Sequence, residues 1–431
     1  MTGRAVFPFS LREKSRANAN VRRALGAVGV PGGGSAVIAA TLLLGVLGLS
    51  GCSAHCSFLM FYCHDDLVAK APDKLIPPDQ PGPYGVSATT LDWTDARGQT
   101  LRAEVWYPVD LGSCEPEPYE ELPISGLACR DEPPRQGNYE LIAFSHGFAG
   151  IRYQSIFLTE TLAQHGYVVV APDHPGNTLL DFDETRIGSV AMRRPGDIAA
   201  AVDELQARRL DSDSPLSDMY FPDTYGVAGH SFGGWTSLAV AGGVVDLDGL
   251  RIFCADPVNM EIDYDLCSII EEFPPETTSA DFDEPDPRAI SAIPMAPAGW
   301  YAFSPTDSAG EQISDGLSSV APTLLFGGTL DETETIDKEI RPLWDRLPTP
   351  AALGILEGAG HYTFSDICLI GDIQPECEEA EGGYIELDVS HAIVNELALA
   401  WFGVTVRGDD SYQEYLDRAV DRWAELEWET R

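Results

Sequence analysis

The sequence predicts an α/β protein with a mainly parallel central sheet, helices on both faces, and inserts that are bracketed by cysteines. Short apolar runs alternate with longer amphipathic stretches along most of the chain, which is typical of a parallel sheet covered on both sides. Most of the runs end in Gly, His, Asp or Pro. With 431 residues, 44% of them hydrophobic, the chain can bury a sizeable core.

The expected strands follow one another with helical stretches between them. Residues 101–109 alternate like a strand, and six apolar runs come after it: 140–147, 167–174, 225–231, 289–297, 323–328 and 352–358. Residues 155–166 and 194–210 are the clearest helices between these runs. In an open sheet of this kind, the functional site lies beyond the carboxyl ends of the strands. The residues that end the runs are therefore the candidates for chemistry.

The run at 225–231 ends in "GHSFGG", a G-x-S-x-G pattern with an expected helix at 235–241 after it. A sharp strand-to-helix turn needs glycines on both sides, and it lifts a serine oxygen to a helix N-terminus that favours negative charge. The alternative is a Gly-rich packing turn, while a nucleotide loop is disfavoured because no Gly-Lys-Ser/Thr follows. We predict Ser231 as a nucleophile, with the side chain of His230 pointing away from it.

A serine nucleophile needs a base that is held by an acid, in the chain order serine, acid, histidine. Asp331 follows the run at 323–328, and His361 follows the run at 352–358. These two residues are therefore the predicted acid and base. Other ionisable residues nearby or at strand ends are the rivals: Glu332, Glu334, His174 and His391.

The loop after the run at 140–147 is the candidate for one half of an oxyanion hole. One backbone N–H is expected from this loop and one from the residue after the nucleophile. We predict the N–H groups of Phe148 and Phe232 as the two donors. The alternative is that His146 and Gly147 merely shape the loop.

The N-terminus resembles the signal of a bacterial lipoprotein. A basic leader precedes an apolar run that ends in "LSGC" at Cys52, which resembles the lipobox at which such proteins are cut and acylated. Residues 1–51 are then a signal peptide and 52–81 a tether. The protein would be exported and anchored through Cys52, with the outer membrane or cell surface favoured. The alternatives are an ordinary secretion signal or a membrane anchor.

The other eight cysteines fall into four close pairs along the chain. Such pairs form disulfides in an oxidising compartment, and nearest-neighbour pairing predicts Cys56–Cys63, Cys114–Cys129, Cys254–Cys267 and Cys368–Cys377. Metal binding is the alternative, because His55 and His64 flank the first pair. No Cys-x-x-Cys spacing is present, so we predict no metal.

The strong acidity of the chain excludes one class of partner. The net charge is −41, from 68 acidic and 27 basic residues, whereas nucleic acid binding needs clustered Lys and Arg. The acidic residues are spread along the chain, which indicates a solvated surface.

The segments "FSHGFAGIRYQS", "HGYVVVAPDHPGN", "GHSFGG", "GGTLDE" and "GAGHYTFSD" together resemble the plasma-type platelet-activating-factor acetylhydrolases and their bacterial dienelactone-hydrolase-like relatives. The resemblance implies an α/β-hydrolase fold, a Ser-Asp-His triad without metal or cofactor, and hydrolysis of short-chain or phospholipid-type acyl esters. The cysteine nucleophile of true dienelactone hydrolases is absent, because position 231 is Ser. A small-molecule or lipid ester is the implied substrate.

The expected hydrolase domain spans 82–405, and an acidic helix is expected at 406–431. Two cysteine-bracketed inserts, at about 110–138 and 243–286, depart from the pattern of the family. The second is either a cap over the acyl pocket or a surface excursion.

Trp300 also follows a strand end, and secreted polyester hydrolases of this fold carry a Trp in a similar place. A core role is the alternative for Trp300. Two other functions therefore stay open: a cutinase-like polyester hydrolase, and an inactive surface lipoprotein on a hydrolase scaffold.

Overall fold

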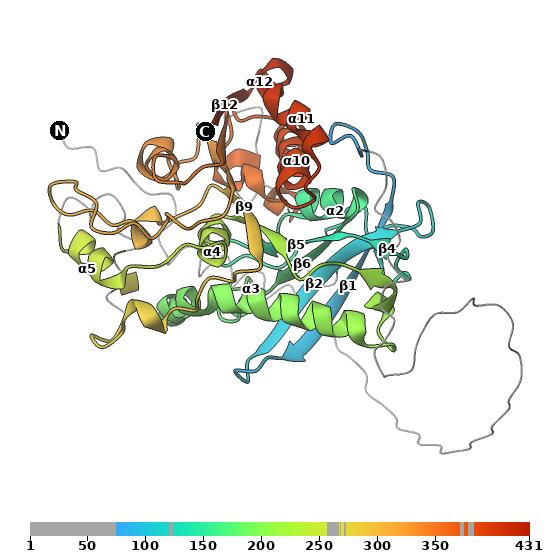
Figure 1. The fold of residues 1–431 in the computed structure, drawn as a ribbon, viewed down its shortest axis with the longest axis horizontal. Helices are drawn as coiled ribbons and strands as arrows, with labels where there is room; N and C mark the ends of the chain where they lie inside the picture. The colour runs from blue at the N-terminus through green and yellow to red at the C-terminus, as the bar shows by residue number, and fades with distance from the viewer. Residues whose placement is uncertain are drawn as a thin grey trace, which may run out of the picture. The chain divides into compact units, whose positions relative to one another are not determined.

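The centre of the protein is a sheet of ten strands within the described part of the chain, in the order β12-β11-β10-β9-β8-β5-β6-β2-β1-β3 (Figure 1). The computed structural model describes residues 75–119, 124–256, 267, 269–270, 273–370, 375–377 and 383–431. Cys52, His55, His64 and the predicted Cys56–Cys63 pair lie outside these ranges.

The seven predicted strands are confirmed as β2, β5, β6 and β8 to β11. The strands are β1 Gly85–Thr94, β2 Thr100–Val109, β3 Cys129–Arg130, β4 Gly137–Asn138, β5 Glu140–Ser145, β6 Tyr167–Pro172, β7 Met219–Tyr220, β8 Tyr225–His230, β9 Ala289–Met295, β10 Thr323–Gly328, β11 Ala351–Leu356 and β12 Leu426–Thr430. The six from β5 to β11 that share the large sheet pair in parallel, while β1–β2, β2–β6 and β11–β12 pair antiparallel. The two-residue strands β4 and β7 pair with each other.

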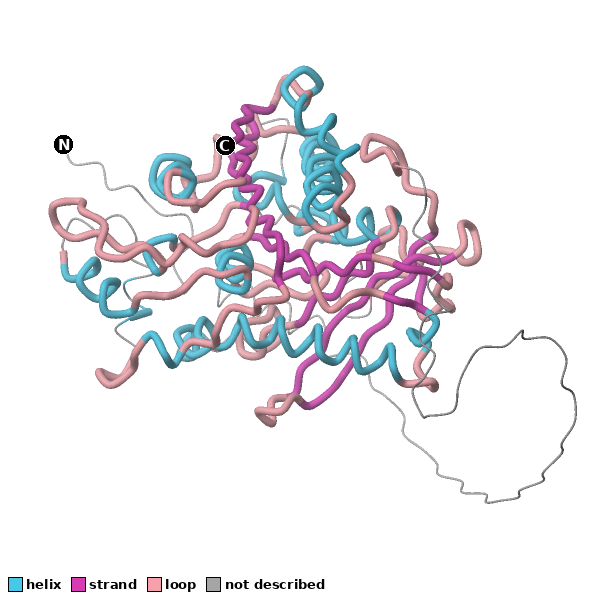
Figure 2. Tube along the Cα trace, viewed as in Figure 1, coloured by secondary structure: helices cyan, strands magenta, loops and turns pink. Residues whose placement is uncertain are grey.

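Helices cover both faces of the sheet, which confirms the predicted fold class (Figure 2). In Figure 1, α2 and α10 lie on the opposite side of the sheet from α3. The α-helices are α2 Ile156–Gln164, α3 Ile187–Leu210, α4 Phe232–Val240, α5 Leu247–Ala255, α8 Arg341–Trp344, α10 Leu387–Thr405, α11 Gln413–Asp417 and α12 Ala419–Arg422. Shorter helical turns are η1 Glu184–Arg186, η2 Pro215–Asp218, η3 Ser279–Asp281, η4 Trp300–Ala302, η5 Ile336–Ile340, η6 His361–Phe364, η7 Ile367–Ile370, η8 Pro375–Cys377 and η9 Asp410–Tyr412.

The strand β6 shows how the sheet divides the core into two layers. Its side chains alternate between the two faces, as in any strand. Val168 and Val170 pack in the core layer that contains α3 and α4. Val169 and Ala171 pack in the layer that contains α2 and α10. Because both faces are covered, the strand is a continuous apolar run that is buried throughout.

Three of the four predicted disulfides are present in the described residues: Cys114–Cys129, Cys254–Cys267 and Cys368–Cys377. In the first insert, β3 adds to the sheet edge beside β1. In the second insert, Phe253 of α5 stacks on Tyr301 with ring centroids 4.5 Å apart.

The prediction of an acidic helix over 406–431 is wrong. Two short helices, α11 and α12, are followed by β12, which pairs antiparallel with β11. The physical reason is a period of two. Leu426 and Trp428 pack on the core, whereas Glu427 and Glu429 both form ion pairs with Arg341. The C-terminal segment is therefore part of the same sheet.

No helix within the described ranges has the length and apolarity to span a bilayer.

Candidate active site

Ser231 sits on a strained turn between β8, which ends at His230, and α4, which begins at Phe232. Its backbone has φ 57° and ψ −121°, a conformation that costs a non-glycine residue about 1–3 kcal/mol. The flanking glycines allow this turn. A Cβ at Gly229 would lie 2.1 Å from the carbonyl oxygen of Gly233, and a Cβ at Gly233 would lie 1.9 Å from that of Ser145. The local sequence therefore builds the predicted elbow.

Ser231, His361 and Asp331 form one hydrogen-bond chain. The distance from Ser231 Oγ to His361 Nε2 is 3.0 Å, and that from His361 Nδ1 to Asp331 Oδ2 is 2.9 Å. Asp331 lies just past β10 and His361 just past β11, so the carboxyl ends of neighbouring parallel strands bring them together. All three side chains are buried, with residue exposures of 4–8%. The structure therefore assembles the three predicted residues in the predicted order.

Asp331, the acid of this hydrogen-bond chain, is held ionised by its surroundings. Burial alone would raise the pKa of Asp331, but the charge and hydrogen bond of His361 and two backbone N–H groups together lower it. These N–H groups belong to Thr333 and Glu334, and they donate to Asp331 Oδ1 over 2.8 and 2.7 Å. An ionised Asp331 orients the ring of His361 so that its Nε2 faces the serine hydroxyl.

The rival histidines have other partners. His174 lies between Ser145 Oγ and Asp197 Oδ2, at 2.9 and 3.0 Å. His391 bonds the carbonyl oxygen of Thr363 and stacks on a phenylalanine ring.

His230 points away from the site, as predicted. It bonds Gln154 Nε2 at 2.7 Å and the carbonyl oxygen of His361 at 2.8 Å. Burial, followed by the charge of His361, lowers the pKa of His230 to about 3. His230 therefore stays neutral and braces the loop that carries the catalytic candidate His361.

Both segments of the predicted oxyanion hole reach the serine. A Cβ at Gly147 would lie 3.4 Å from the Cβ of Ser231, so the loop that carries Phe148 abuts the nucleophile. The N–H of Gly147 donates to Gln154 Oε1 over 2.9 Å, which fixes the loop. Phe232 is the first residue of α4, and an N–H in the first helical turn has no acceptor inside its helix. The arrangement fits two N–H donors beside Ser231.

Comparison with known proteins agrees with this geometry. Residues 142–376 match the model of the alpha/beta hydrolase family. The chain belongs to this family. It is 24% identical over 287 residues to Cutinase 2 of Thermobifida cellulosilytica, covering 66% of this chain and 75% of that protein. It is also 24% identical over 287 residues to Cutinase cut1 of Thermobifida fusca, covering 66% of this chain and 61% of that protein. Cutinase est1 of Thermobifida alba is 33% identical over 115 residues, 26% of this chain and 34% of that protein. The prediction of an ester hydrolase is thereby confirmed.

Glu376 is a residue of the hydrolase site that sequence reasoning missed. Its carboxylate accepts the backbone N–H groups of His361 and Tyr362, over 2.9 and 2.6 Å. Burial raises the pKa of Glu376, while the charge of His361 acts against this rise. The next residue, Cys377, is joined to Cys368. The only signal in the sequence was that disulfide, which ties Glu376 to the histidine loop.

Trp300 of the hydrolase has contacts that account for its burial. Its indole N–H donates to the carbonyl oxygen of Lys338 over 2.8 Å, and the guanidinium of Arg346 lies 4.1 Å from its ring centroid. The ring centroids of Trp300 and Tyr301 are 4.2 Å apart. These contacts favour the core interpretation, and the substrate contact stays a prediction.

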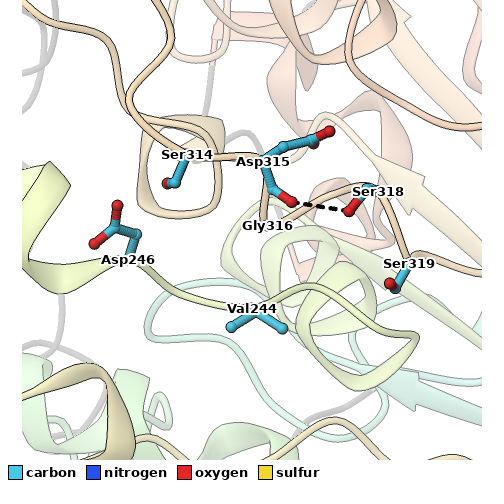
Figure 3. A pocket seen from close by; sticks show the side chains of 7 residues that line it. All are labelled: Val244, Asp246, Ser314, Asp315, Gly316, Ser318 and Ser319. Carbon is cyan, nitrogen blue, oxygen red and sulfur yellow. Dashed lines mark hydrogen bonds between the residues drawn. The ribbon is translucent and has the colours of Figure 1, made fainter.

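A hollow of about 330 Å³ lies where the second insert leaves the hydrolase core (Figure 3). It is lined by Val244, Asp246, Ser314, Asp315, Gly316, Ser318 and Ser319, none of which belongs to the triad. The carboxylate of Asp246 caps α5 by accepting the N–H of Gly249 over 2.9 Å. Within the described ranges, no group of three or more His, Cys, Asp or Glu is placed to hold a metal ion.

Proposed function

We propose that the protein hydrolyses carboxylic esters through an acyl-enzyme on Ser231, with His361 as base and Asp331 as its orienting acid. The observation that carries this proposal is the hydrogen-bond chain from Ser231 Oγ through His361 to Asp331 at the strained elbow. A serine hydroxyl is a weak nucleophile on its own, and this arrangement supplies the base that activates it.

The reaction has two steps. His361 takes the proton of Ser231 as the serine oxygen attacks the ester carbonyl, and Asp331 stabilises the imidazolium that forms. The N–H groups of Phe148 and Phe232 hold the negative oxygen of the tetrahedral intermediate. The alcohol leaves with the proton from His361, and water activated by the same histidine then cleaves the acyl-enzyme. No residue outside the chain is required for either step.

The substrate class that we propose is short-chain or phospholipid-type acyl esters, on the resemblance of the segments around the triad to platelet-activating-factor acetylhydrolases. A second candidate is a cutinase-like polyester hydrolase, which the similarity to the Thermobifida cutinases supports. The burial of Trp300 beneath Arg346 counts against a tryptophan platform for a polymer.

The test is the hydrolysis of p-nitrophenyl esters from acetyl to dodecanoyl by the wild type beside Ser231→Ala, together with product release from a polyester film. We expect serine-dependent turnover that peaks at short chains and exceeds release from the film. A peak at long chains, or faster release from the film, would contradict the proposed substrate class. No turnover above the Ser231→Ala background would favour the inactive scaffold.

We also propose that the protein is an exported lipoprotein that is anchored in a membrane through Cys52. The "LSGC" sequence at the end of the apolar run supports this. Metabolic labelling with an alkyne fatty acid should tag the wild type and not Cys52→Ala. Equal labelling of the two proteins would contradict the anchor.

A further inference from the structure

Arg194 is a wholly buried cation on α3, and neutral oxygens surround it. Its Nε donates to Thr236 Oγ1 over 2.8 Å and its Nη1 to Asn177 Oδ1 over 2.9 Å. Its Nη2 donates to Ser145 Oγ over 3.1 Å and to the carbonyl oxygen of His146. Burial lowers the pKa of Arg194 to about 9, so the guanidinium is charged at neutral pH.

Three of the four acceptors of Arg194, all except Asn177, belong to the two segments of the predicted oxyanion hole. Ser145 and His146 lead directly into the loop that carries Phe148, and Thr236 lies on α4, one turn after Phe232. The ring of Phe232 itself lies over the guanidinium, with 4.3 Å between the ring centroid and Cζ. The side chain of Arg194 therefore contacts both segments that are predicted to supply the two N–H donors.

Ser145 also belongs to a second serine–histidine–aspartate arrangement, which orients it toward Arg194. Ser145 Oγ lies 2.9 Å from His174 Nε2, and His174 Nδ1 lies 3.0 Å from Asp197 Oδ2. The carboxylate of Asp197 keeps the histidine proton on Nδ1, so Nε2 accepts the hydroxyl proton of Ser145. The serine oxygen is then left to accept from Arg194.

This second arrangement has no access for a substrate, because Ser145, His174 and Asp197 are all 0% exposed. Its role is instead electrostatic, because it links the positive charge of Arg194 to the negative charge of Asp197. The hydrogen-bond chain runs from the guanidinium of Arg194 through Ser145 and His174 to Asp197, which offsets the positive charge. Asp197 is held in turn by Arg97, over 2.7 Å. A buried network of connected hydrogen bonds holds its members in one geometry.

We propose that Arg194 is a positioning residue for the oxyanion hole, holding the loop of Phe148 and the start of α4 so that both N–H groups point at one oxygen. This inference rests on the proposed function. Preorganised donors are worth more than flexible ones because they need no rearrangement as the charge develops. Loss of Arg194 should therefore slow the chemical step more than it weakens substrate binding.

The test compares Arg194→Met, Arg194→Lys and Ser145→Ala with wild type. Arg407→Met is the control: it removes an arginine whose side chain is only 13% exposed, which pairs with Glu140 and has its Cζ 4.4 Å from the centroid of the Tyr167 ring. One readout is kcat and KM on p-nitrophenyl acetate. The other is the labelling rate with a fluorophosphonate, in which Ser231 Oγ attacks phosphorus, fluoride leaves and His361 takes the proton. Thermal unfolding checks folding.

We expect kcat and the labelling rate of Arg194→Met to fall by ~10–10²-fold with KM within about threefold, since one oxyanion donor alone is worth ~10²–10³. The kcat and the labelling rate of Ser145→Ala should fall less than those of Arg194→Met. Arg407→Met should be less stable than wild type but keep its kcat. If Arg194→Met does not fold, the kcat and labelling rates of Arg194→Lys and Ser145→Ala test the inference instead, because these two substitutions disturb the buried network less. Folded variants that are labelled as fast as wild type overturn the inference alone. A wild type that is neither labelled nor active overturns the proposed function and the inference with it.

Discussion

Gly233→Ala tests the geometry of the elbow most sharply among single substitutions. The added Cβ would lie 1.9 Å from the carbonyl oxygen of Ser145 and 2.8 Å from that of His146, both backbone atoms. An ordinary contact begins at 3.4 Å, so α4 and the end of β5 must separate by roughly 1.5 Å. The N–H of Phe232 moves with α4. A misplacement of about 1 Å at a reacting centre costs ~10²-fold in rate, so we expect kcat to fall by at least ~10²-fold.

The assay is turnover of p-nitrophenyl acetate together with urea unfolding, on wild type, Gly233→Ala and Gly310→Ala. Gly310 is the control because its φ is 79° and a Cβ there meets nothing within 4 Å. We expect this control to lose about 1–2 kcal/mol from backbone strain and to keep its kcat. Overpacking at Gly233 should cost about 1–3 kcal/mol. A folded Gly233→Ala with wild-type kcat would refute the contact between the two segments.

Three further predictions concern the acid Asp331, the support of the histidine loop by Glu376, and the buried carboxyl of Asp366. Asp331→Asn should lower kcat by ~10⁴-fold without unfolding the protein, since His361 loses its correct tautomer; steady-state kinetics with circular dichroism checks this, and a change below tenfold would count against it. Glu376→Gln removes the charge, and its amide can accept from only one of the two N–H groups of the histidine loop. We therefore expect kcat to fall while KM changes little, and a changed KM with constant kcat would contradict this role. Burial raises the pKa of Asp366 to about 7, so its contribution to stability is full below the unfolded pKa of about 4 and is lost as the pH rises to 7. Urea unfolding at pH 4 and pH 7 checks this. Between pH 4 and pH 7, the free energy of unfolding of wild type should fall by up to about 4 kcal/mol relative to that of Asp366→Asn. A relative change of opposite sign would refute the buried, protonated carboxyl.

The triad was predictable because each member lies within five residues of the end of a strongly apolar strand. The runs that end before Ser231, Asp331 and His361 are buried on both faces and read clearly in the sequence. The elbow was predictable for a second reason, since its glycines are demanded by backbone contacts that any such turn makes.

Features that depend on distant partners were not predictable. His174 ends a strand in the same way as His361, and only its enclosure by Ser145 and Asp197 shows that it is a structural residue. Glu376 is joined to the histidine loop by a contact that no local pattern encodes. The strand β12 is short and acidic, so its period of two was hidden by its charge.

The most direct test of the proposed triad is the mass of the protein, and of its tryptic peptides, after reaction with a fluorophosphonate. We expect one adduct on the peptide that carries Ser231, absent in Ser231→Ala and formed much more slowly in His361→Ala. No adduct on the folded wild type, or an adduct on Ser145 instead, would contradict the claim that Ser231, His361 and Asp331 are the catalytic residues.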